Sequence, residues 1–120
     1  MRRDESYIED IYNAAADARE FVAGMRYETF ATNRLVQRAV VNCLEQIGEA
    51  SKRLSTDFKR QHPEIFWQEL MTHRNYLAHE YFRIDFGQVW LMVEDVLPGL
   101  IETLRPLLPP NLDLPYDREP

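Results

Sequence analysis

The sequence predicts an all-α fold, specifically a mostly antiparallel four-helix bundle. Apolar residues recur at helical spacing in four segments of the 120-residue chain. No segment shows the strict alternation of a β-strand, and the length suits one small domain with a single core. We expect the bundle to occupy residues 1–108 and a proline-rich tail to follow over residues 109–120, either as an extended arm that lies on a neighbour or as a disordered segment.

The first helix is expected over residues 6–23. Ser6 and Glu9 have the three-residue spacing of a capping box at its start. Gly24 is a residue type that favours a helix end. The acidic residues of this segment are expected to form its solvent-facing side.

The second helix is expected over residues 30–54, with an apolar stripe wider than one core face needs. Gly48 inside it destabilises a helix by about 1 kcal/mol relative to alanine. We therefore expect another helix to approach closely there. For Glu49, two interpretations stay open: a plain surface carboxylate, or a partner that orients Arg74 from the second helix.

The last two helices have clearer boundaries in the sequence. A turn or short helix over residues 58–62 precedes the third helix, which we expect to begin at Pro63 and to end near residues 79–81. The last helix is expected to begin with Asp85 as its cap. Pro98 should kink it or divide it in two, because proline cannot continue the hydrogen-bond ladder of a helix.

Chemically versatile side chains concentrate in residues 73–81. Asn75 and His79 are four apart and share a helix face, and the long Arg74 side chain can reach the same face. Guanidinium groups bind phosphate oxygens and imidazole transfers protons near neutral pH, so the cluster suits phosphodiester chemistry. Alternatively, Arg74 and His79 only stabilise a helix end, where cations are favoured. His73 either contacts phosphate or merely occupies the helix surface.

The order R-x-x-x-x-H-x-Y formed by Arg74, His79 and Tyr81 resembles the signature of the HEPN superfamily, and specifically its HepT-like toxin branch. The Ile-Gly-Glu-Ala segment at residues 47–50 is similar to a helix of that branch, and Trp67 has a counterpart there. The resemblance covers nearly the whole chain.

This resemblance implies an HEPN-like bundle and a metal-independent endoribonuclease toxin, in which the ribose 2′-hydroxyl attacks the adjacent phosphate. Arg74 would stabilise negative charge, His79 would act as general base or acid, and Asn75 would position the motif. RNA is the expected substrate and DNA is not, because DNA lacks the 2′-hydroxyl. A homodimer is also implied, with two Arg74–His79 pairs lining one cleft. The expected antitoxin is a nucleotidyltransferase of the MntA type that adenylylates Tyr81.

A non-catalytic alternative is a dimeric HEPN adaptor that binds a nucleotide through Arg74 as the partner of a nucleotidyltransferase. His79 favours the nuclease, since an adaptor has no evident need for it. The net charge of −6 favours the adaptor and argues against a surface that coats nucleic acid. Residues 26–83, however, hold nine Lys or Arg against seven Asp or Glu, which permits a local phosphate site.

Other kinds of site are not predicted. His62, His73 and His79 are eleven and six residues apart, which does not match the i, i+4 spacing of a helical zinc pair, and no cofactor is expected. The single cysteine, Cys43, lies in an apolar segment and is expected to be a small buried hydrophobe rather than a nucleophile. No signal peptide or membrane-spanning stretch is evident, so we expect a cytoplasmic protein.

Overall fold

The computed structural model describes residues 3–80 and 82–109, and all regular structure in these residues is helical, which confirms the predicted all-α bundle. The helices in chain order are α1 (Asp4–Phe21), α2 (Tyr27–Ala31), α3 (Arg34–Arg53), α4 (Thr56–Gln61), α5 (Trp67–His79), α6 (Phe86–Leu91) and α7 (Leu97–Leu104). A π-helical segment, Met92–Val96, joins α6 to α7, and a 3-10 turn, Arg105–Leu107, follows α7.

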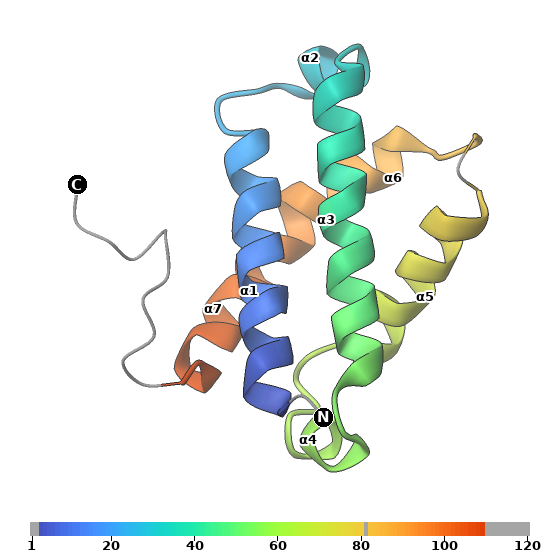
Figure 1. Ribbon diagram of the computed structural model, residues 1–120. Coiled ribbons are helices and arrows are strands. Elements are labelled where there is room, and N and C mark those ends of the chain that lie inside the picture. The colour runs from blue at the N-terminus through green and yellow to red at the C-terminus, as the bar shows by residue number, and fades with distance from the viewer. Residues whose placement is uncertain (1–2, 81, 110–120) are drawn as a thin grey trace.

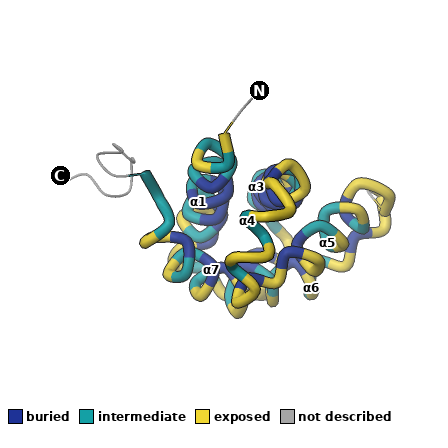
Figure 2. The backbone as a smooth tube through the Cα atoms, turned by 90° about the horizontal axis from the view of Figure 1, so that it is seen from below, coloured by how far each residue is buried: buried dark blue, intermediate teal, exposed yellow. Residues whose placement is uncertain are grey.

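Helix α3 lies at the centre of the arrangement. It packs against α1 on one side and α5 on the other, and the chain runs antiparallel in each pair (Figure 1). Helix α7 packs against α1, and in the view of Figure 1 it lies behind the layer that α1 and α3 form (Figures 1 and 2). The largest fully buried side chains are Ile8, Ile11, Tyr12, Val22, Phe30, Val40, Ile47, Leu77, Val89, Leu97 and Leu104.

Helix α1 begins earlier than the sequence predicts. The prediction that Ser6 caps it is wrong, because the helix starts at Asp4 and Ser6 lies in its first turn. The Asp4 carboxylate accepts hydrogen bonds from the backbone N–H and the hydroxyl of Ser55, at 2.9 and 2.7 Å, so this contact fixes the helix start to the beginning of α4. The helix ends at Phe21, and Gly24 adopts a φ of 77° in the turn that follows.

The second predicted helix corresponds to α3, which begins at Arg34 and not at residue 30, because the separate short helix α2 ends just before it. The Asn33 carboxamide caps α3 by accepting a hydrogen bond from the Val36 N–H at 3.0 Å. The buried Gln37 side chain donates to the carbonyls of Phe30 and Ala31, both at 3.0 Å, and thereby satisfies groups at the end of α2. The break is therefore stabilised by hydrogen bonds on both sides.

The turn or short helix predicted over residues 58–62 is the helix α4, and the Ser55 hydroxyl caps it by accepting from the Phe58 N–H at 3.0 Å. The third predicted helix, however, starts at Trp67 in α5 and not at Pro63. The Trp67 side chain is buried, and its indole N–H donates to the carbonyl of His62 at 3.0 Å. This contact holds residues 63–66 as a turn.

The last helix begins at the predicted cap, since the Asp85 carboxylate accepts from the N–H of Gly87 at 2.9 Å. It is also divided near Pro98, as predicted, but the irregularity lies before the proline, in the π-helical segment. There the N–H of Leu97 donates to the carbonyl of Met92, five residues back. The wider loop accommodates the proline ring, which has no N–H of its own to donate.

The π-helical segment is also supported from α1. Arg19 donates to the Val93 carbonyl at 3.3 Å and forms an ion pair with Glu94 at 3.0 Å. The Arg19 guanidinium therefore binds a backbone carbonyl in a segment where the regular α-helical hydrogen bonds are interrupted.

Most of the wide apolar stripe that the sequence shows is used inside the monomer. The large side chains that stay exposed on these helices are few: Leu35 on α3 is 81% exposed, and Leu91 and Val96 are exposed near the division of the last helix. None of the helices in residues 3–80 and 82–109 combines the length and hydropathy needed to cross a bilayer. Residues 110–120 of the predicted tail lie outside the described residues.

Candidate functional site

The candidate site begins with a close approach between α3 and α5 at Gly48. A Cβ atom built on Gly48 would lie 2.1 Å from the Cβ of Arg74 and 2.9 Å from the carbonyl oxygen of Leu70. Any side chain there would therefore collide with α5. The close approach predicted from this glycine is confirmed.

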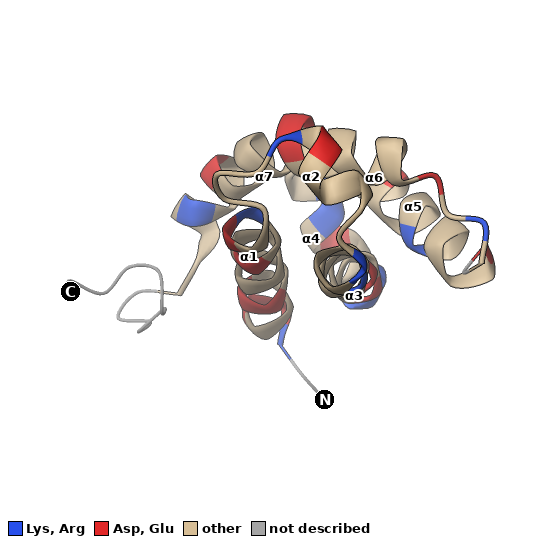
Figure 3. Ribbon diagram, turned by 90° about the horizontal axis from the view of Figure 1, so that it is seen from above, with Lys and Arg blue, Asp and Glu red and all other residues tan. Residues whose placement is uncertain are grey.

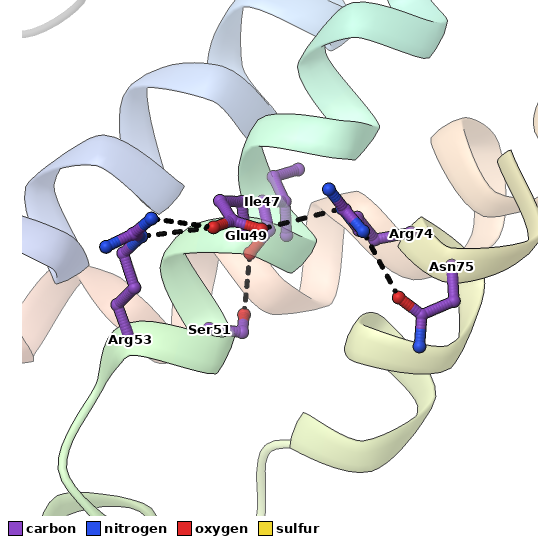
Figure 4. Close-up of polar contacts among 6 residues, drawn as sticks. All are labelled: Ile47, Glu49, Ser51, Arg53, Arg74 and Asn75. Atoms are coloured by element: carbon purple, nitrogen blue, oxygen red, sulfur yellow. Dashed lines mark hydrogen bonds and ion pairs between the residues drawn. The ribbon is translucent and has the colours of Figure 1, made fainter. Parts of the chain in front are cut away.

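The residue after Gly48 turns toward Arg74 across the same contact. The Oε2 atom of Glu49 lies 3.6 Å from Nε of Arg74, which forms an ion pair between the two helices (Figure 4). The other carboxylate oxygen, Oε1, lies 3.0 Å from Nη2 and 3.1 Å from Nε of Arg53 (Figure 4). Glu49 thus bridges two arginines, and this contact is the one expected if it orients Arg74.

Asn75 holds the far side of the Arg74 guanidinium. Its Oδ1 atom accepts a hydrogen bond from Nη1 of Arg74 at 3.3 Å (Figure 4). The Arg74 side chain is 33% exposed, so the guanidinium is held from two sides and still reaches solvent. A guanidinium held in this way presents its remaining N–H groups to an anion with little further loss of side-chain entropy.

His79 is the last residue of α5, and it is exposed. It lies four residues after Asn75 and therefore on the same helix face. Among residues 3–80 and 82–109, no hydrogen bond or ion pair joins His79 to Arg74 or Asn75. The structure thus brings Arg74, Asn75 and Glu49 together and leaves the imidazole one helical turn away, open to solvent.

His73 faces a different environment from His79. It is half-buried, and its ring stacks on that of Tyr76 with centroids 6.1 Å apart. Burial lowers the pKa of His73 below its ordinary value of 6.5, so the ring is uncharged at neutral pH. It therefore adds no positive charge to the site.

The segment after α5 is held at both ends. Tyr81, which the sequence predicts as a modification site, lies outside the described residues. On either side of it, the N–H of Glu80 donates to the Tyr76 carbonyl at 2.9 Å, and the N–H of Arg83 donates to the Glu80 carbonyl at 2.8 Å. The Tyr76 hydroxyl accepts from the N–H of Asp85 at 2.8 Å, which ties the segment back to α5.

Two of these contacts were not anticipated from the sequence. Arg53 shares Glu49 with Arg74, and the i, i+4 spacing of Glu49 and Arg53 on one helix could have indicated it. The bond between Tyr76 and Asp85 has no such signal, because it joins residues of different elements across the turn.

The surface on the other side of Glu49 is acidic. A groove of about 390 Å³ lies between α1 and α3, and its polar lining consists mainly of Asp10, Asn13, Asp17, Gln46, Glu49 and Arg53. Figure 3 shows acidic residues along α1 and cations on α3, α4 and α5. Carboxylates repel phosphate, so a polyanion is expected to approach Arg74 from the α5 side.

Cys43 is buried in α3, as predicted. Burial, with a smaller contribution from the Asp17 carboxylate, raises the pKa of its thiol to about 11. The sulfur is therefore protonated at neutral pH and is a packing group rather than a nucleophile.

Comparisons with known proteins agree on one family. Residues 11–107 match the family model described as Ribonuclease HepT-like. The chain is 41% identical over 99 residues to "Probable ribonuclease HepT" of Thermococcus cleftensis, a match that covers 82% of this chain and 90% of the relative. It is 37% identical over 100 residues to "Putative RNase MJ1380" of Methanocaldococcus jannaschii, covering 82% and 92% of the two chains. No solved structure gave a significant match.

Proposed function

The chain belongs to the HepT-like ribonuclease family, and on that premise we propose that it is a metal-independent endoribonuclease whose reaction centre is Arg74 and His79. One observation carries the proposal: the Arg74 guanidinium is held by Glu49 and Asn75, and His79 stands exposed on the same helix one turn later. Phosphodiester cleavage uses a group that transfers protons and a cation that stabilises negative charge, and these two side chains can supply both.

In the proposed reaction, the ribose 2′-hydroxyl attacks the adjacent phosphorus atom. His79 transfers one of the two protons involved, either from the attacking hydroxyl or to the leaving 5′-oxygen. Arg74 stabilises the charge that grows on the phosphoryl oxygens in the transition state. The products are a 2′,3′-cyclic phosphate and a 5′-hydroxyl, and the substrate is RNA because DNA has no attacking group.

We also propose that the active form is a homodimer in which two Arg74–His79 pairs share one cleft. One chain supplies a single motif histidine, whereas the reaction includes two proton transfers, so a second copy would supply the second group. The exposed Leu35, Leu91 and Val96 are apolar surface that such an interface would bury.

The regulation that fits this site is that of a toxin and its antitoxin. The proposed antitoxin is a nucleotidyltransferase of the MntA type that adenylylates Tyr81, two residues after His79. The transferred group brings a phosphate next to the motif. Its negative charge would compete with RNA for Arg74 and so silence the enzyme.

The decisive experiment measures RNA cleavage by the purified chain in EDTA, after intact mass has shown that Tyr81 is unmodified. Wild type should cut and leave 2′,3′-cyclic phosphate ends. Arg74→Ala and His79→Ala should each lose roughly 10²- to 10⁴-fold in rate, the usual contribution of such a group. Arg60→Ala, which removes an exposed cation from α4, should cut like wild type.

Circular dichroism and sedimentation should show that all variants fold and assemble alike. If the unmodified wild type is inert, or if His79→Ala cuts equally well, the nuclease proposal fails. The non-catalytic adaptor that binds a nucleotide through Arg74 then takes its place.

A further inference from the structure

A second groove, of about 340 Å³, lies between the turn that precedes α5 and the segment where the π-helical turn passes into α7. Its apolar lining comes from Phe66 and Leu70 on one side and from Val96 and Leu100 on the other. A Cβ atom built on Gly99, in the α7 wall, would meet nothing within 4 Å, so this wall is open. The groove therefore has room for apolar side chains of another molecule.

Phe66 is the apolar residue of this groove that the core does not use. Leu70 and Leu100 are buried and belong to the core, whereas Phe66 is 69% exposed. Within residues 3–80 and 82–109, the Phe66 ring contacts no other aromatic ring. Val96 is also part of the apolar surface assigned above to the homodimer, and Phe66 is not. The exposure of Phe66 therefore calls for a different occupant.

The walls of the groove are acidic. Glu64 and Asp95 line it, and neither residues 63–70 nor residues 95–103 contain a Lys or Arg. Asp95 is exposed and forms no hydrogen bond or ion pair with the described part of the chain. The side chain of Glu64 is 52% exposed, and its one ion pair, at 3.4 Å, requires a protonated His62. Negative charge beside apolar surface repels RNA and favours a cationic occupant.

We propose that this groove docks a segment of a partner protein that carries large apolar side chains next to lysine or arginine. The apolar side chains cover Phe66 and fill the space above Leu70 and Leu100, and the cations pair with Asp95 and Glu64. The groove lies at the start of α5, a helix about 20 Å long that ends at His79. The docking site is therefore separate from the proposed reaction centre and does not depend on it.

The test uses two defined peptides and the full chain without RNA. One short fluorescent peptide repeats the order lysine-leucine-leucine-lysine, and the other has serine in place of leucine. The leucine peptide should bind, and the serine peptide should bind at least about 10-fold more weakly because it buries no apolar side chains. In methyl NMR spectra, the leucine peptide should shift the signals of Leu70 and Leu100 and leave that of the exposed Leu35 on α3 unchanged.

Two variants with matched controls test the groove itself. Phe66→Ala should weaken binding of the leucine peptide about 5- to 30-fold, and Asp95→Asn about 2- to 5-fold, as loss of one exposed charge contact does. Phe82→Ala removes a more exposed ring beyond the other end of α5 and should bind like wild type. So should Glu28→Gln, which removes an exposed carboxylate from α2, at the opposite end of the bundle from α4 (Figure 1).

Three results would overturn the proposal. The first is equal affinity for the two peptides, or equal affinity of Phe66→Ala and Phe82→Ala, which would mean attraction by the net charge alone. The second is a set of methyl shifts at Ala14 and Ala50, in the acidic groove between α1 and α3, in place of Leu70 and Leu100. The third is loss of self-association in sedimentation on adding the peptide and in Phe66→Ala, which would assign the groove to a second copy of this chain.

Discussion

Gly48 of α3 lies directly against the Cβ of Arg74 on α5, with no room for a side chain between them. The backbone carbonyl of Leu70 closes the same space, 2.9 Å from where a Cβ would stand. This contact sets the distance between α3 and α5. It therefore also fixes how far the Arg74 guanidinium lies from the Glu49 carboxylate.

Replacement of Gly48 by alanine should destabilise the protein. Alanine favours a helix by about 1 kcal/mol over glycine, but the clash involves a Cβ and a backbone oxygen, which no rotamer change can move. We expect a net loss of about 1 to 3 kcal/mol in the free energy of unfolding, measured by urea denaturation.

Gly99→Ala is the control for this measurement. Gly99 is also helical, in α7, and a Cβ there would meet nothing within 4 Å. This variant should be as stable as wild type or more stable by up to about 1 kcal/mol. Equal stability of the two alanine variants would contradict a rigid contact between α3 and α5.

The helices with strong local signals were predictable, and the break between α2 and α3 was not. The apolar spacing that predicts α3 starts at Leu35, and residues 30–34 contain no glycine or proline that would mark a break before it. The break depends on hydrogen bonds between the side chains of Asn33 and Gln37 and backbone groups. The sequence pattern alone does not indicate that these polar side chains form such bonds. Similarly, Pro98 predicted a division but not the five-residue bonding before it.

The candidate site was predictable where two signals met. Gly48 indicated that another helix packs closely there, and Glu49 follows it in the sequence. An ion pair between Glu49 and Arg74 could therefore be anticipated. Whether the side chains of Arg74 and His79 point to the same place could not be predicted. Five residues along a helix place two side chains about 140° apart, and rotamers decide whether they converge.

Glu49→Gln should separate positioning from binding at Arg74. The carboxylate orients the guanidinium, but its negative charge also opposes phosphate. Under the proposed function, we expect kcat for RNA cleavage to fall roughly 10- to 100-fold, as misplacement of a reacting group does, while KM stays the same or decreases. A raised KM with an unchanged kcat would contradict the positioning role.

Arg53→Ala is the control for Glu49→Gln. Arg53 pairs with the other oxygen of Glu49 and is more exposed than Arg74, so its loss leaves the carboxylate in place. Because exposed ion pairs within a helix stabilise it only slightly, this variant should keep nearly wild-type stability and most of the wild-type kcat.

Tyr76→Phe should loosen the segment between α5 and α6. The substitution removes the hydroxyl that accepts the Asp85 N–H and keeps the ring that stacks on His73. Backbone amides of residues 82–85 should then exchange hydrogen faster by mass spectrometry, with about 1 kcal/mol lost in global stability.

The matched variant for Tyr76 is Tyr27→Phe, at a tyrosine whose contact is the edge of its ring against Trp90. This variant should leave exchange in residues 82–85 unchanged. Unaltered exchange in Tyr76→Phe as well would mean that the hydroxyl does not hold this segment.

His73 should make stability depend on pH in mildly acidic solution. Burial lowers the pKa of the folded-state ring below 6.5, so the unfolded chain takes up a proton at higher pH than the folded chain does. The contribution of His73 to the free energy of unfolding is therefore complete above about pH 7. It should fall as the pH drops through 6.5 toward the folded-state pKa.

Urea denaturation between about pH 5.5 and 7.5 tests this sign. The difference in unfolding free energy between wild type and His73→Gln should shift in favour of the variant as the pH falls, because glutamine takes up no proton. His79→Gln, a change at the exposed end of α5, keeps the buried ring and should follow the wild-type pH dependence. If His73→Gln follows wild type as well, the His73 ring is not the source of the pH dependence.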